Sequence, residues 1–246
     1  MVRPPMTTST RAAGLPPRHA RFVRITHWLT TIAVVALLVS GIELILSHPR
    51  FYWGEVGNVN TTPLFWLRVP SSRSTVPTPY AFRLPDQNGW SRYLHFQAAW
   101  LVLFTGLAYV VLAFRTGHVR RNLVPPRADR SWPALRTTIV DHLRFSTAAL
   151  GDERSYNALQ RLSYLAIIFV LFPLVIWTGL AMAPAFTALF PSTVTFLGGR
   201  QSARTLHFLA TIALVLFAIA HVTMIVLAGF RSRVGAMIIG SSERRQ

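Results

Sequence analysis

Four long apolar runs, each about the length of a membrane-spanning helix, constrain this chain more than any other feature. They cover residues 24–46, 91–114, 161–184 and 205–230 of the 246 residues, and each is almost free of charge. Since a helix rises about 1.5 Å per residue, about 20 residues cross the hydrocarbon layer of a bilayer. We therefore expect an all-α integral membrane protein, a four-helix bundle with a long external loop between the first two helices.

The positive charge of the chain is unevenly placed. The net charge is +17, and all 25 cationic residues are Arg. Most of them lie in the N-terminal tail, in the connection between the second and third runs, and in the C-terminal tail. The positive-inside rule then predicts that both termini are cytoplasmic. In a soluble protein such a charge would suggest nucleic acid, but here membrane lipid explains it, and we expect no nucleic-acid partner.

The composition outside the runs predicts three parts. Residues 1–21, rich in Pro, Thr and Arg, read as a disordered cytoplasmic tail; residues 22–235 form the membrane domain; and residues 236–246 form a second cytoplasmic tail. The first run is as long as a full span, and no A-x-A site follows it directly, so we expect a retained helix. Pro173 predicts a kink in the third span.

Four histidines lie inside the runs, at depths that match in pairs. In a topology of in-out, out-in, in-out, out-in, His27 and His221 fall near the cytoplasmic side, and His95 and His207 near the external side. His207 and His221 are fourteen residues apart, so both lie on one face of the fourth helix, separated by about 21 Å along its axis. Bis-imidazole pairs at two levels of a bundle are typical of two low-spin b-type haems.

Other interpretations of these histidines stay open. A single His in a membrane helix is also typical of a hydrogen bond between helices. Four at matched depths favour function, because a polar group in hydrocarbon is costly. The absence of Cys excludes disulfides, thiolate-held iron-sulfur clusters and covalent CxxCH haem. Any metal must therefore bind His, Met or a carboxylate, as it also would in a transporter.

Several glycines and arginines are candidates for the surroundings of the haems. Gly41 stands at the level of the external pair and Gly106 near the cytoplasmic pair, where each would let a macrocycle edge approach the helix. Arg92 and Arg204 each precede an external His by three residues, and Arg24 lies near an internal one. These cations are suited to pairing with propionates. All five residues are equally typical of helix contacts or membrane boundaries.

The histidine pattern, with Trp28 directly after His27, resembles the bacterial cytochrome b561 and nickel-hydrogenase-type cytochrome b superfamily. That superfamily includes the gamma subunits of formate dehydrogenase and the cytochrome b subunits of hydrogenase and thiosulfate reductase. The resemblance covers about residues 20–235. It implies two non-covalent b-type haems held by the four histidines, in a bacterial inner (cytoplasmic) membrane.

A second match lies at the start of the third span. The stretch from Tyr156 to Arg161 is similar to the Tyr-Asn-x-x-Gln-Lys/Arg sequence of the formate dehydrogenase type, which lies beside the cytoplasmic haem at a quinone site. The resemblance thereby implies quinone-binding roles for Tyr156, Asn157 and Gln160. A quinone carbonyl needs polar donors at the membrane edge, and Asn157 and Gln160 are three residues apart on one helical face. The alternative is that Asn157 and Gln160 serve as a helix cap and an interface residue.

The resemblance implies an electron-transfer subunit of a membrane oxidoreductase. Catalysis is then expected in a partner subunit. Electrons would pass between an external (periplasmic) oxidoreductase and the quinone pool, in a direction that the sequence does not fix. The long loop at 47–89 departs from the formate dehydrogenase type and looks like membrane subunits of molybdopterin oxidoreductases, which favours such a partner. The alternatives are a stand-alone cytochrome b561-type quinol oxidase, a His-based metal transporter and a haem-free anchor.

Overall fold

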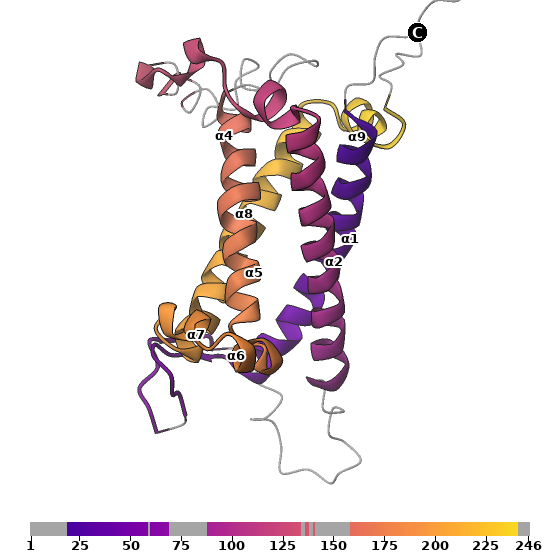
Figure 1. Cartoon of the computed structure of the whole chain (residues 1–246). Coiled ribbons are helices and arrows are strands. Elements are labelled where there is room, and N and C mark those ends of the chain that lie inside the picture. The colour runs from indigo at the N-terminus through magenta and orange to yellow at the C-terminus, as the bar shows by residue number, and fades with distance from the viewer. Residues whose placement is uncertain are drawn as a thin grey trace, which may run out of the picture.

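Four long helices form an upright bundle in the computed structural model, which describes residues 19–58, 60–68, 88–133, 136–137, 140 and 158–240 (Figure 1). All four are long and apolar enough to cross a membrane, so the predicted all-α membrane bundle is confirmed. The bundle consists of α1 (Arg21–Ser47), α2 (Asn88–Arg115), a third span built from α4 (Ala158–Ala166), the π-helical turn η5 (Ile167–Leu171) and α5 (Phe172–Leu180), and α8 (Arg200–Leu227).

The helices pack as two antiparallel pairs, α1 with α2 and α5 with α8. In Figure 1 the upper end of the bundle holds the start of α1 and the end of α8, and the lower end holds the end of α1 and the start of α2. Because each connection reverses the chain, α1 and the third span run downward while α2 and α8 run upward.

The interior of the bundle is lined by small side chains, and the large apolar ones face outward. Bulky residues such as Ile32, Phe104 and Leu216 are more than half exposed, at 63%, 62% and 61%. Such an arrangement suits a surface in contact with lipid, since close helix approach in a membrane depends on small residues. The buried residues in the spans include Ala33, Ser40, Ala98, Thr105, Ala113, Thr178, Ala203, Thr205 and Ala210.

The third span is irregular where the sequence predicts a kink. A π-helical turn, η5, directly precedes Phe172 and Pro173. Pro lacks an N–H and its ring crowds the carbonyl four residues earlier, so a wider turn there relieves the helix. The span ends at Leu180 rather than at residue 184, and two short helices follow at the lower end, α6 (Pro184–Leu189) and α7 (Ser192–Phe196).

The fourth span is shifted toward the N-terminus relative to the predicted 205–230. Helix α8 begins at Arg200, since polar residues can continue a helix beyond the apolar run, and it ends at Leu227. Gly229, with a φ of 99°, then turns the chain into α9 (Phe230–Ile238), which the sequence analysis did not include. Residues 1–18, 69–87 and 241–246 of the predicted tails and loop lie outside the described residues, as do Tyr156 and Asn157.

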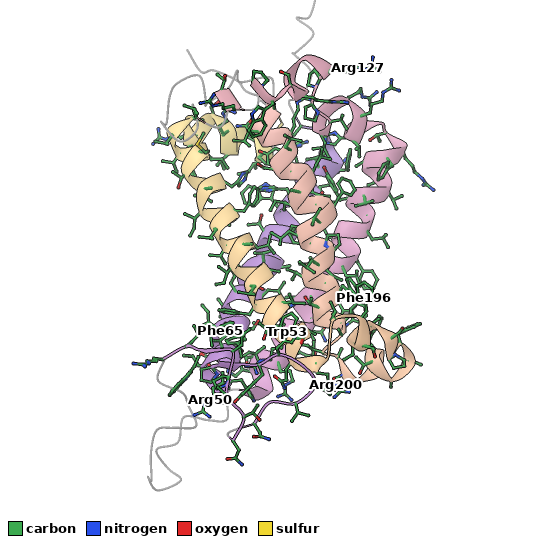
Figure 2. All side chains as sticks on the ribbon, turned by 90° about the vertical axis from the view of Figure 1, so that its left-hand side faces the viewer. Arg50, Trp53, Phe65, Arg127, Phe196 and Arg200 are labelled. Atoms are coloured by element: carbon green, nitrogen blue, oxygen red, sulfur yellow. The ribbon has the colours of Figure 1, made fainter. Side chains whose placement is uncertain are left out.

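Short elements close both ends of the bundle. At the lower end, β1 (Arg50–Phe51) and β2 (Phe65–Trp66) pair antiparallel, with Arg50 opposite Trp66 and Phe51 opposite Phe65. At the upper end lie the π-helical turn η2 (Val119–Leu123) and the 3-10 turn η3 (Arg127–Arg130). Figure 2 shows the side chains of Arg50, Trp53, Phe65, Phe196 and Arg200 gathered at the lower end and Arg127 at the upper end.

Candidate functional site

Two pairs of histidine rings face each other within the bundle, one pair toward each end. Near the lower end, the ring centroids of His95 on α2 and His207 on α8 are 6.2 Å apart, with an interplanar angle of 62°. Near the upper end, those of His27 on α1 and His221 on α8 are 6.4 Å apart, at 51°. The structure thus brings together the four rings that the sequence pairs, and α8 contributes one ring to each pair.

The separation within each pair suits one metal between two imidazoles. A ligating imidazole nitrogen stands about 2 Å from a transition metal, and the ring centre lies about 1 Å farther, so trans ligands have centroids about 6 Å apart. The observed 6.2 and 6.4 Å agree with that spacing. Within the described residues, no group of three or more His, Cys, Asp and Glu is placed to hold a metal ion. Each pair offers two nitrogen donors, the number that a metal already held by a four-nitrogen macrocycle still needs.

The ring of His95 is held through its Nδ1 atom. The Oγ atom of Ser40 on α1 lies 3.0 Å from this nitrogen. The Ser40 hydroxyl donates to the carbonyl of Ala36 at 2.7 Å, so its proton is already used. The hydroxyl oxygen must then accept from the Nδ1–H of His95, which leaves the lone pair on Nε2. That tautomer is the one that can bind a metal through Nε2.

The ring of His207 is held in the same way from α5. Its Nδ1 atom lies 3.0 Å from the carbonyl oxygen of Val175 and 3.0 Å from Oγ1 of Thr178. A carbonyl only accepts, so Nδ1 carries the proton, and Nε2 has the lone pair. The Thr178 hydroxyl donates to the carbonyl of Leu174 at 2.7 Å and is likewise an acceptor toward the ring.

The upper pair has different surroundings. The Nδ1 atom of His27 is buried, and no residue in the described part of the chain hydrogen-bonds it. A buried nitrogen without a partner costs about 1–3 kcal/mol, which fits a ring whose remaining partner is not an amino acid. The ring of His221 stacks on Phe217 at 5.6 Å and meets the edge of Tyr164 at 6.3 Å. Apolar and aromatic groups therefore surround the upper rings.

An aromatic cluster joins the loop after α1 to α8 next to His207 in the sequence. Phe208, which directly follows His207, lies 4.4 Å from the ring of Phe51 and 5.9 Å from that of Phe65. Phe51 itself is only 2% exposed. The first strand of the loop is thereby packed on α8, one residue beyond His207.

Backbone hydrogen bonds fix the same loop to the start of α8. The carbonyl of Gly54 accepts from the N–H groups of Gln201 and Ser202, at 3.0 and 3.3 Å, and the carboxylate of Glu55 accepts from the N–H of Arg200 at 3.0 Å. These N–H groups have no partner within the helix, so the loop caps it. Glu55 also lies 3.7 Å from the guanidinium of Arg200.

The predicted arginines have partners other than a cofactor, or face outward. The guanidinium of Arg24 donates to the carbonyl of Ile238 at 2.9 Å, at the end of α9. That of Arg204 donates to the carbonyl of His48 and lies 5.0 Å above the ring of Phe51. Arg92 is exposed. Arg24 and Arg204 thus bind α9 and the loop, and their predicted role toward propionates stays a prediction.

The two predicted glycines differ in what surrounds them. A Cβ added at Gly41 would stand 3.6 Å from Cε1 of His95, so Gly41 lies against a ring of the lower pair. A Cβ at Gly106 would meet nothing within 4 Å. Gly179, which the sequence analysis missed, mirrors Gly41, because a Cβ there would stand 3.4 Å from Cε1 of His207.

Of the predicted quinone residues, Gln160 alone falls in the described part of the chain. It is half-buried on α4, four residues before Tyr164, and Tyr164 contacts the ring of His221. Residues four apart share one face of a helix. The face of α4 that carries Gln160 therefore also reaches the upper ring pair.

The sequence matches a known family and a curated protein. The family model described as prokaryotic cytochrome b561 matches residues 18–240. A curated relative, the putative protein-methionine-sulfoxide reductase subunit YedZ1 of Azospira oryzae, is 30% identical over 214 residues, which cover 85% of this chain and 90% of the relative. No solved structure matches the chain significantly.

Proposed function

This chain belongs to the prokaryotic cytochrome b561 family, and on that premise we propose that it carries electrons across the membrane between the quinone pool and an oxidoreductase partner. The family implies b-type haem, and the two ring pairs support two such haems. His95 and His207 would hold one, and His27 and His221 the other. Such a haem supplies reversible one-electron transfer. The observation that carries the proposal is the two pairs of facing rings, at 6.2 and 6.4 Å, each with one ring on α8.

The chain's own residues would hold, orient and shield the haems. Each histidine would ligate through one nitrogen, and in the lower pair the acceptors at Nδ1 fix the tautomer that leaves Nε2 free. On α8 the side chains between the two histidines include Ala210 and Ala218, which leave room for a flat ring. The loop packed on Phe208 would exclude water from the lower haem.

The two ends would serve different reactants. The arginines near the upper end favour the cytoplasmic side by the positive-inside rule, which would put both termini in the cytoplasm of a bacterial inner membrane. Quinone would then bind beside the upper haem, near Gln160 and with Tyr156 and Asn157. The lower end would face the periplasm and the partner.

The relative's name supports a choice of partner and direction. It describes a subunit of a protein-methionine-sulfoxide reductase, and a reductase consumes electrons. We therefore favour a flow from quinol through the upper and then the lower haem to a periplasmic reductase, with a molybdopterin enzyme as the expected partner class. Hydrogen bonds fix the loop to the start of α8, so it would give such a partner an ordered surface beside the lower haem.

Co-expression with a methionine sulfoxide reductase catalytic subunit tests this function. Membranes that hold the chain are reduced with a quinol, and haem absorbance is followed after addition of methionine sulfoxide. We expect reoxidation only when the catalytic subunit is present. Equally fast reoxidation by oxygen alone, with no partner, would instead establish the stand-alone quinol oxidase. Purified protein that binds zinc and no haem would establish the metal transporter.

A further inference from the structure

The lower ring pair is held by a hydroxyl and a glycine from each of two neighbouring helices. Ser40 and Gly41 on α1 contact the ring of His95, and Thr178 and Gly179 on α5 contact that of His207. In both cases the hydroxyl reaches Nδ1 at 3.0 Å while the glycine lies against Cε1. The same two-residue device thus occurs twice, once for each ring.

Both hydroxyls are fixed as acceptors and shielded from water. Ser40 and Thr178 are each 0% exposed. Their protons are used in hydrogen bonds of 2.7 Å to the carbonyls of Ala36 and Leu174. Since no water competes with them, each oxygen accepts the Nδ1–H of its ring continuously. Each ring of the lower pair therefore donates a hydrogen bond from Nδ1 that polarises the ring.

The upper pair lacks this device in the described residues. Nδ1 of His27 has no hydrogen-bond partner there. Thr31, one turn beyond His27, donates to the backbone carbonyl of His27 at 2.8 Å and not to its ring. Thr211 does the same with the carbonyl of His207. Hydroxyls thus occur near both levels, but those that reach a ring lie at the lower one.

We propose that Ser40 and Thr178 are positioning residues that lower the reduction potential of the lower haem relative to the upper one, an inference that rests on the proposed haem function. An acceptor at Nδ1–H increases the electron donation of the ring through Nε2. Greater donation stabilises ferric over ferrous iron and so disfavours reduction of that haem. On the proposed path from quinol to partner, the step from the upper to the lower haem is then uphill, and the lower haem is the stronger reductant toward the partner.

The glycines lie against the same rings that the hydroxyls contact. A methyl group at Gly41 or Gly179 would stand in ordinary van der Waals contact with the ring, at 3.6 or 3.4 Å. The hydroxyl and the glycine are adjacent in sequence, so one short segment of each helix controls both the position and the polarity of a ring.

Redox titration of the purified full chain, followed by haem absorbance, tests this inference. In Ser40→Ala we expect one of the two haem components to shift to higher potential while the other stays. Thr178→Val should shift the same component by less, because the carbonyl of Val175 remains on His207. Ser40→Thr, which keeps the hydroxyl, should restore the wild-type potential. The matched controls Thr31→Val and Thr211→Val remove hydroxyls that bond only to backbone, and they should leave both potentials unchanged.

Two results would overturn the inference. One is an unshifted lower component in both Ser40→Ala and Thr178→Val. The other is an equal shift of both components, which would indicate a general structural effect. Failure of the proposed function is distinguishable from both, because wild-type protein would then show no haem component that His95→Ala removes.

Discussion

The buried hydroxyl of Thr205 donates a hydrogen bond of 2.7 Å to the backbone carbonyl of Tyr52, and this bond joins the start of α8 to the loop that follows α1. Thr205 is 0% exposed and Tyr52 6%. The bond lies two residues before His207, so the loop and the lower ring pair are held by the same turn of helix.

Thr205→Val should therefore loosen the loop. It leaves a buried carbonyl without a partner, which costs about 1–3 kcal/mol, and each ~1.4 kcal/mol corresponds to about a tenfold rise in loop opening. Tryptic cleavage after Arg50, in β1, should accelerate by the same factor as loop opening. Thr116→Val is the control, because the Thr116 hydroxyl, one residue beyond α2 at the upper end, donates to the carbonyl of Leu112 and contacts no loop of the lower end. Equal cleavage rates in wild type and Thr205→Val would contradict the proposed anchoring.

Gly199→Ala should disrupt the same junction more strongly. Gly199 has a φ of +115° and a ψ of 168°, a region that is essentially restricted to glycine. A Cβ there would stand 2.4 Å from the backbone of Gly54. We expect a lower unfolding temperature in detergent and faster cleavage of the loop. Gly89→Ala, whose Cβ would meet nothing within 4 Å, is the control and should unfold like wild type; an unchanged Gly199→Ala would exclude this docking of the loop.

The span and histidine pattern could be predicted because both depend on local sequence. Apolar runs fix the depth of each residue, and the helical period puts His207 and His221 on one face of α8. Ser40 and Thr178 could not be found in this way. A hydroxyl in an apolar helix ordinarily bonds to its own backbone, and the sequence does not show which helix lies beside which ring.

Contacts with irregular segments could not be predicted from the sequence either. The hydrogen bond of Arg24 to the carbonyl of Ile238 joins α1 to α9, a contact that the charge and depth of Arg24 do not indicate. Helix α9 has no long apolar run to reveal it, since its nine residues include two Arg and a Gly. The packing of Phe51 on Phe208 joins residues far apart in sequence, which no local pattern reports.

His118, just beyond the upper end of α2, should make stability depend on pH. Burial lowers the pKa of this imidazole, and the nearby Arg121 lowers it further. A depressed folded-state pKa means that the unfolded chain binds the proton first as the pH falls. The stability that neutral His118 contributes is therefore present above the ordinary pKa of about 6.5, and it is lost as the pH falls through the folded value.

His118→Phe tests this dependence, because a phenyl ring can keep the edge contacts with Phe22 and Tyr109. The unfolding temperature of wild type should fall more than that of the variant between pH 7 and pH 5. A constant offset at all pH values is expected from the lost hydrogen bond between Asn122 and His118. Parallel curves for the two proteins would show that His118 does not titrate with unfolding.

Gln160→Leu should separate quinone binding from haem binding. The side chain lies on the face of α4 that reaches His221 through Tyr164, so loss of its amide should slow reduction of the haems by quinol. Reduction by dithionite, which needs no quinone site, should give an unchanged spectrum. Gln97→Leu removes an exposed amide near the lower end and should reduce normally. A Gln160→Leu protein as fast as wild type with quinol would place the quinone elsewhere.

The most direct test of the central claim is the haem-to-protein ratio from reduced-minus-oxidised spectra of the purified chain and its four single variants, His27→Ala, His95→Ala, His207→Ala and His221→Ala. We predict two haems per wild-type chain and one in each variant. His95→Ala and His207→Ala should lose the same spectral component, and His27→Ala and His221→Ala the other. A wild-type ratio of one or none, or loss of different components by the two members of a pair, would contradict the assignment.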